Sequence, residues 1–322
     1  MAGQWFYVAL RDKGLRIMTI RAGVAGAGVF GGYHANKYAE TDTARLCAVY
    51  DAFEKPAVGL AAKHGAEGTT DFDAFLDKVD ALTITAPASY HFDLAHKALL
   101  AGKHVLVEKP IALNLSDADR LVALATERGL ILQVGHQERY VFQAFGLLAR
   151  SAPLEVHSRR LNKFSGRAMD VSVVFDLMIH DLDLLNQVAD GEATNVTATA
   201  RFEHGDQSDQ TQTRIVFSSG LTATLAASRL EVEPVRDMRL VYDDGEIHID
   251  FLKREVTNTT GTPLQTDFSA DNPPQAFKDP LAFGTQSFLR AIEEGGHPVV
   301  DGKAGRAALD LALRVEAAAS VA

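Results

Sequence analysis

Three side chains of this 322-residue chain are of the types that move protons or stabilise a negative oxygen: Lys109, Asp176 and His180. Asp176 and His180 are four residues apart in a run rich in Leu, Met, Ile, Val and Phe, so a helix would place them on one face, with Asp183 extending the polar stripe. Burying such groups is costly unless they are paired or used. The stripe therefore predicts either an acid–base site or a core histidine satisfied by Asp176.

Lys109 directly follows a predicted strand over residues 104–107 and precedes Pro110. In an open α/β sheet the carboxyl ends of the strands face the ligand crevice, so Lys109 is expected to point at a reacting group. Its ammonium would stabilise a developing alkoxide there. We expect Glu108 to have a positioning role and to pair with Lys109, and His91 to be a helix-entry residue.

A glycine-rich turn, Gly26-Ala27-Gly28-Val29-Phe30-Gly31, has the form G-x-G-x-x-G between a predicted strand and a predicted helix. Gly26 would permit the tight turn, Gly28 the approach of a pyrophosphate and Gly31 close packing of helix on strand. The helix N-terminus adds free N–H groups and the positive end of its dipole. The turn predicts a dinucleotide site whose contacts are listed together: Gly26, Gly28, Val29, Phe30, Gly31, Asp51, Glu108 and Lys109.

Asp51 ends the second predicted strand, about 20 residues after the glycines, where a carboxylate accepts hydrogen bonds from ribose hydroxyls. A 2′-phosphate at that point would meet the same negative charge. The sequence therefore favours NAD over NADP, and Lys55 nearby weakens this preference.

Two kinds of pattern divide the chain. Strands and helices alternate up to about residue 138, which is typical of a doubly wound parallel sheet, the Rossmann fold. A helix over about 170–188 follows, then alternating strands over 194–203, 210–218, 221–230, 237–243 and 246–251, and helices over 280–294 and 303–320. We predict an α/β protein with an N-terminal extension (1–17), an NAD-binding Rossmann domain (18–138), and an α+β domain for substrate binding and oligomerisation (139–322) with an open-faced, mostly antiparallel sheet.

Charge and composition disfavour two classes of partner, nucleic acids and membranes. The formal net charge is -10, which disfavours nucleic acid, and no run approaches the roughly 20 apolar residues of a membrane helix. The single cysteine, Cys47, lies in an apolar run, so we expect a core residue, no disulfide, no metal site and a cytoplasmic location.

The glycine turn, the segment 101–110 (AGKHVLVEKP), and Pro87 and His91 together resemble the glucose–fructose oxidoreductase / inositol dehydrogenase / MocA (Gfo/Idh/MocA) family over about residues 18–320. The resemblance implies NAD(P)-dependent hydride transfer at a sugar or cyclitol carbon. It also implies that Asp176 and His180 are the family's Asp and His pair. In this interpretation His180 takes the hydroxyl proton, Asp176 orients the imidazole and Lys109 holds the oxygen, or Lys109 is itself the principal proton carrier.

Segments 135–140 (GHQERY) and 176–185 (DLMIHDLDLL) are similar to one branch of the family, the dehydrogenases that oxidise C3 of UDP-N-acetylglucosamine. The resemblance implies a nucleotide-sugar substrate. Residues that would neutralise its diphosphate are Arg139, Arg160, Lys163 and Arg167, and the alternative for these four is a solvated basic patch.

Two other functions remain open at this point: a dehydrogenase of free sugars or inositol, and a non-catalytic NAD-binding sensor. An uncovered sheet face in the second domain predicts a homo-oligomer, a dimer or a tetramer.

Overall fold

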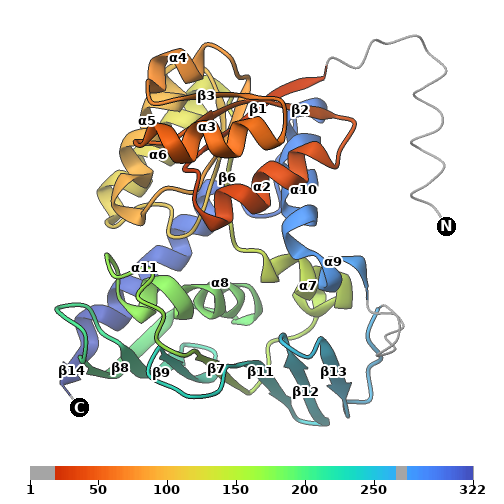
Figure 1. The fold of residues 1–322 in the computed structure, drawn as a ribbon. Helices are drawn as coiled ribbons and strands as arrows, with labels where there is room; N and C mark the ends of the chain where they lie inside the picture. The colour runs from red at the N-terminus through yellow and green to blue at the C-terminus, as the bar shows by residue number, and fades with distance from the viewer. Residues whose placement is uncertain (1–18, 266–273, 322) are drawn as a thin grey trace.

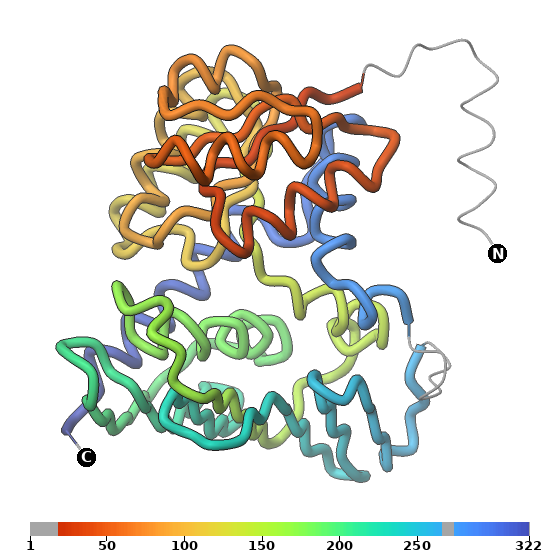
Figure 2. The backbone as a smooth tube through the Cα atoms, viewed as in Figure 1, coloured from red at the N-terminus to blue at the C-terminus, as the bar shows by residue number. Residues whose placement is uncertain are grey.

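The computed structural model describes residues 19–265 and 274–321, and the expected extension at 1–17 lies outside this range. Two sheets lie one above the other in Figure 1, the first built from the N-terminal part of the chain, and Figure 2 traces the backbone in the same view. Helices from the end of the chain reach back to the first sheet in the same views.

The first sheet has six parallel strands in the order β3-β2-β1-β4-β5-β6. The strands are β1 (Ile20–Ala25), β2 (Ala44–Tyr50), β3 (Glu67–Thr69), β4 (Ala81–Ile84), β5 (His104–Val107) and β6 (Leu132–Val134). Strand β4 is buried along its whole length, as expected of a parallel strand covered on both faces. The predicted doubly wound sheet is confirmed, and the order reverses between β1 and β4, where such folds bind ligands.

Helices cover both faces of this sheet. They are α2 (Val29–Ala39), α3 (Glu54–Lys63), α4 (Phe72–Leu76), η1 (Ala88–Tyr90), α5 (His91–Leu100) and α6 (Leu115–Arg128). Side-chain oxygens cap two of them: Asp71 accepts hydrogen bonds at the start of α4, and Asn114 accepts one at the start of α6. His91 begins α5, which confirms its predicted place at a helix entry.

The second sheet has eight strands in the order β13-β12-β11-β7-β10-β9-β8-β14 and is mostly antiparallel, as predicted. Its strands are β7 (Glu155–Leu161), β8 (Ala193–Arg201), β9 (Gln210–Phe217), β10 (Thr222–Ser228), β11 (Val235–Tyr242), β12 (Gly245–Asp250), β13 (Glu255–Asn258) and β14 (Ala319–Val321). The parallel pairs are β7 with β10 and β8 with β14. Sequence patterns did not predict β7, β13 or β14.

The helical layer of the second sheet lies on one side of it, between the two sheets (Figure 1). It begins with α7 (Glu138–Phe145) and η2 (Leu147–Ala149). The predicted helix over 170–188 starts at residue 174, with a wide π-type turn, η3 (Val174–Met178), followed by α8 (Ile179–Val188).

The last helices are shared between the two sheets. They are α9 (Gln275–Lys278), α10 (Pro280–Glu294) and α11 (Gly302–Ala318). Phe288 and Leu289 of α10 are buried with Tyr38 in the core beside the first sheet. Helix α11 places Leu309 in the other core of that sheet and Val315 in the core of the second. The division at residue 139 stays a prediction, since α10 packs with the first sheet although it follows that boundary.

Candidate active site

The glycine turn after β1 is shaped by its backbone. Gly26 has a φ of +108°, which L side chains rarely adopt, and a Cβ at Gly31 would overlap the Gly26 carbonyl oxygen. A Cβ at Gly28, by contrast, would meet nothing within 4 Å. The turn therefore leaves open space beside Gly28, at the N-terminus of α2, where a pyrophosphate can approach the backbone.

Asp51 follows β2 and braces this turn. Its Oδ2 accepts a hydrogen bond from the Ala27 N–H at 2.8 Å, and its Oδ1 accepts one from the Phe53 N–H at 3.0 Å. Each carboxylate oxygen retains a lone pair, so ribose hydroxyls can still be bound. Val29 and Phe30 are exposed at the same place. These residues fit a dinucleotide, and the individual contacts to it stay predictions.

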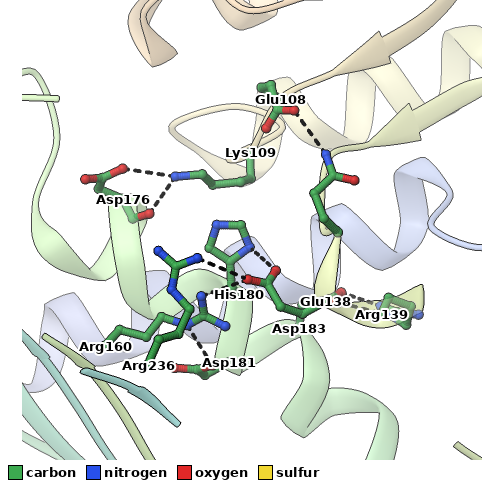
Figure 3. A network of polar contacts seen from close by, with 11 residues as sticks. Glu108, Lys109, Glu138, Arg139, Arg160, Asp176, His180, Asp181, Asp183 and Arg236 are labelled. Carbon is green, nitrogen blue, oxygen red and sulfur yellow. Dashed lines mark hydrogen bonds and ion pairs between the residues drawn. The ribbon is translucent and has the colours of Figure 1, made fainter. Parts of the chain in front are cut away.

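Lys109 follows β5 and faces the second sheet. Its Nζ donates to the main-chain oxygen of Asp176 at 2.5 Å and to Asp176 Oδ1 at 3.0 Å. The Lys109–Pro110 peptide bond is cis, and the buried ring of His91 lies 2.7 Å from the Pro110 oxygen. Lys109 thus joins the two halves of the site (Figure 3).

The expected pairing of Glu108 with Lys109 is wrong. Glu108 Oε1 lies 2.8 Å from His34 Nε2 and accepts a hydrogen bond from Gln137 Nε2 at 3.2 Å. The reason is geometric: Glu108 is buried on the side of α2, whereas Lys109 extends the other way to Asp176. The nearest partner of the Glu108 carboxylate is thus the His34 ring, and the predicted contact of Glu108 with the cofactor stays a prediction.

His180 lies near the start of α8 and its partner is Glu138 rather than Asp176. His180 Nδ1 is 2.9 Å from Glu138 Oε2, a close contact without good hydrogen-bond alignment. The prediction that Asp176 orients the imidazole is corrected for this reason: Asp176 lies in the wide turn η3 and is engaged by Lys109, while Glu138 from α7 occupies the place beside the ring (Figure 3).

The protonation states follow from burial and these pairs. Burial lowers the pKa of His180 to about 4, and the Glu138 carboxylate opposes this change. Burial acts to raise the pKa of Asp176, but the Lys109 ammonium holds that pKa below its usual value. His180 is therefore neutral at neutral pH. Because the Glu138 carboxylate can only accept hydrogen bonds, its contact with Nδ1 favours the tautomer with the proton on Nδ1, which leaves Nε2 as the basic nitrogen.

His136, which follows β6, is a second buried imidazole at this place. Its ring lies edge-on to that of His180, with 5.9 Å between centroids. Neither of its ring nitrogens has a hydrogen-bond partner within the described residues. Burial lowers the pKa of His136, so it too is neutral at pH 7.

A set of ionised residues, here called the charge cluster, lies below His180 (Figure 3): the buried Glu138, Arg160 and Asp181, and the partly exposed Arg236. Arg160 is 2% exposed and donates to Glu138 Oε1 at 2.9 Å and to Asp181 Oδ1 at 2.8 Å. The cluster ties β7 and β11 to α7 and α8, and so fixes the carboxylate that contacts His180.

The structure separates the four basic residues that the sequence grouped. Arg139 is buried in a two-point ion pair with Asp183, and Arg160 is engaged as described above. The expectation that these two arginines carry free charge for a diphosphate is wrong, because each is already neutralised by carboxylates. Lys163 and Arg167 are exposed on the connection after β7, and their substrate contact stays a prediction.

Glu138, His136, Asp181 and Arg236 belong to the site and were not predicted, and two of them carried a usable signal. Glu138 lies just beyond β6, at the carboxyl edge of the first sheet, and that position was a usable signal. Arg236 shares the inward phase of β11 with the buried Met238 and Leu240. An arginine in an otherwise apolar alternation is a second signal, since buried charge is rare unless paired or used.

Two kinds of site are absent from the residues that the structure describes. In residues 19–265 and 274–321 no group of three or more metal-ligating side chains comes together. Within the same ranges no helix has the length and apolarity needed to cross a bilayer.

Comparisons with known proteins agree with this geometry. Residues 20–136 match the model of an oxidoreductase family with an NAD-binding Rossmann fold, and residues 148–248 match the GFO/IDH/MocA C-terminal domain. UDP-N-acetylglucosamine 3-dehydrogenase of Acidithiobacillus ferrooxidans is 37% identical over 309 residues, covering 93% of this chain and 97% of that protein.

A solved structure of the A. ferrooxidans enzyme superposes with a TM-score of 0.84 at 35% identity, covering 94% of this chain and 98% of the other. Inositol 2-dehydrogenase of Rhizobium meliloti is 28% identical over 325 residues, which cover 92% of this chain and 95% of that enzyme. Both kinds of relative are thus similar to this chain along nearly its whole length.

Proposed function

This chain belongs to the Gfo/Idh/MocA family of NAD-dependent oxidoreductases, and from that premise we propose that it oxidises C3 of a UDP-N-acetylhexosamine such as UDP-N-acetylglucosamine. One observation carries the proposal: Lys109, at the carboxyl edge of the first sheet, pairs with Asp176 and lies beside His180 (Figure 3). The identity of 37% with a UDP-N-acetylglucosamine 3-dehydrogenase supports the choice of substrate.

His180 is the base of the proposed reaction. Oxidation of a secondary alcohol removes a hydride and a proton, and bound NAD⁺ supplies the hydride acceptor. The neutral imidazole takes the hydroxyl proton on Nε2, and Glu138 at 2.9 Å from Nδ1 stabilises the imidazolium that forms. In the reduction of a ketone the same imidazolium returns the proton.

Lys109 holds the reacting oxygen. Its ammonium, fixed by the two oxygens of Asp176, lowers the free energy of the developing alkoxide. Asp176 therefore positions Lys109 instead of orienting His180. The division of proton transfer between Lys109 and His180 is part of the proposal. His180 is the principal carrier because the Lys109 Nζ already donates to two oxygens of Asp176, whereas the imidazole is neutral and has a ring nitrogen that can accept.

The substrate is tested by following NADH absorbance with purified protein, NAD⁺ and a panel of UDP-N-acetylglucosamine, free sugars and inositols. We expect NADH to form with the nucleotide sugar. Turnover of free inositol alone would make the chain a cyclitol dehydrogenase. Tight NAD⁺ binding without turnover of any polyol would favour the non-catalytic sensor.

We also propose a homo-oligomer, a dimer or tetramer, in the cytoplasm. The face of the second sheet that turns away from the described helices carries polar and charged side chains, among them Arg159, Thr224 and Arg239. A self-association surface there would be polar rather than a simple apolar patch. Sedimentation velocity should give a mass of two or four chains, and a monomer at all concentrations would contradict the proposal.

A further inference from the structure

Arg236 is placed to meet the substrate. It lies on β11 in the phase of Met238 and Leu240, whose side chains are fully buried on the helical side of the sheet. Its guanidinium therefore leaves the sheet toward the active site, and Figure 3 shows it beside His180 and Glu138. The residues above it in the same view, Lys109 and Asp176, are those of the reacting centre.

The two arginines of the charge cluster are engaged very differently. Arg236 and Arg160 are direct cross-strand neighbours on β11 and β7. Arg160 forms ion pairs at 2.8 and 2.9 Å, whereas the nearest carboxylate oxygen to Arg236, on Glu138, is 4.0 Å away. Within the described residues the Arg236 side chain has no hydrogen bond. Its five N–H donors thus remain available.

A partly buried Arg236 charge without a close carboxylate is unfavourable for the chain when no ligand is bound. Two like charges opposite each other on neighbouring strands destabilise a sheet. The side chain is only 37% exposed, and burial together with Arg160 lowers the pKa of Arg236. Lys109 and Arg160 each have a carboxylate oxygen within 3.0 Å, whereas the contact of Arg236 with Glu138 is 4.0 Å long. The charge cluster holds two carboxylates and two guanidiniums, but Arg160 makes both short ion pairs, so the Arg236 guanidinium can still bind an anion.

We propose that Arg236 binds an anionic oxygen group of the substrate, either a phosphate of the nucleotide or a carboxylate on the sugar ring. The planar fork of a guanidinium fits both groups with two parallel hydrogen bonds. Arg236 then selects anionic substrates over neutral cyclitols. This inference rests on the proposed function, because it assigns a role in binding the nucleotide sugar.

The test compares Arg236→Gln and Arg236→Lys with the wild type. The matched control is Arg239→Gln, on the same strand in the outward phase, whose Nη1 lies 3.4 Å from Glu246. Calorimetric titration in the presence of NADH uses three probes: UDP-N-acetylglucosamine, its uronic acid and UDP. We expect Arg236→Gln to weaken binding by about 10- to 100-fold, Arg236→Lys by less, and the control to bind as the wild type.

The probes separate the two anionic groups. Loss of affinity for all three indicates a phosphate contact, and loss for the uronic acid alone indicates a carboxylate contact. Unchanged affinity of Arg236→Gln for all three overturns the inference while leaving the proposed function intact. If the wild type binds no UDP compound, both fail. If binding depends on Arg236 but no nucleotide sugar is oxidised, only the proposed reaction fails. A melting temperature at or above that of the wild type shows that each variant is folded.

Discussion

The glycine turn and the charge cluster, the two ends of the active site, differ in how far apart their parts lie in the sequence. The turn is built from six consecutive residues, Gly26–Gly31, and one brace, Asp51. The charge cluster draws residues from α7, β7, α8 and β11, spread over about a hundred positions. A local backbone shape binds the cofactor, whereas long-range ion pairs position the groups for the chemistry.

This difference has a thermodynamic side. The turn is sensitive to added side-chain volume, because a methyl group at Gly31 would overlap the Gly26 carbonyl oxygen. Paired charges make the second region sensitive to protonation and to the loss of a partner, since a buried charge left alone is strongly unfavourable. The two regions should therefore fail under different perturbations.

The largest effect is expected from removing the reacting groups. Lys109→Ala and His180→Ala should each lower kcat by about 10²- to 10⁴-fold, because each removes a proton carrier or the alkoxide partner. NAD⁺ affinity, measured by equilibrium titration, should stay close to that of the wild type. Unchanged turnover in both variants would end the proposed mechanism, and lost NAD⁺ binding would show that the two regions are not separable.

Acid should destabilise the folded chain through His180, which contacts the charge cluster at Glu138. The pKa of His180 is about 4 in the folded chain against 6.5 for a free side chain, so the unfolded chain binds this proton first as pH falls. Stability should be lost between about pH 6.5 and 4, by on the order of 3 kcal/mol from His180. Melting temperatures should fall less steeply for His180→Gln. His136 and His91, whose pKa values burial also lowers, act in the same direction in both proteins. If the melting temperatures of the wild type and His180→Gln fell in parallel with pH, His180 would not be the group responsible.

Two alanine substitutions separate shape from binding within the turn. Gly31→Ala should lower the free energy of unfolding by about 1–3 kcal/mol, because its methyl group overlaps the Gly26 carbonyl. Gly28→Ala should leave the melting temperature unchanged, since nothing lies within 4 Å of its Cβ, yet weaken NAD⁺ binding by about tenfold or more. Normal NAD⁺ affinity in Gly28→Ala would place the pyrophosphate elsewhere.

The smallest expected change concerns the choice of cofactor. Asp51→Asn removes a negative charge but keeps an acceptor for the Ala27 N–H. The ratio of kcat/KM for NADP⁺ to that for NAD⁺ should rise by about tenfold, because a 2′-phosphate no longer meets a like charge. A constant ratio would mean that Asp51 serves only to brace the turn.

Prediction from sequence succeeded where signals are local. The glycine turn, the parallel sheet and α10 follow from spacing, alternation and helix boundaries, and the predicted bounds of α10 are those observed. The partners of the charged residues were not predictable in this way. Asp176 and His180 have a helix-like spacing in the sequence, but they do not pair with each other. Asp176 pairs with Lys109 and His180 contacts Glu138, and both partners come from other elements. The sequence alone does not show that Arg139 and Arg160 are paired. The fold brings Asp183 and Asp181 of α8 against them.

Helix α11 has a consequence for how this protein comes apart. Leu309 belongs to a core of the first sheet, and Leu311, Ala312 and Val315 belong to the core of the second. If either sheet unfolds and α11 is lost with it, the core of the other sheet loses the α11 side chains that cover it. A single calorimetric transition is the expected behaviour, and fragments cut near residue 139 would each expose an apolar surface that the missing piece covers in the whole chain.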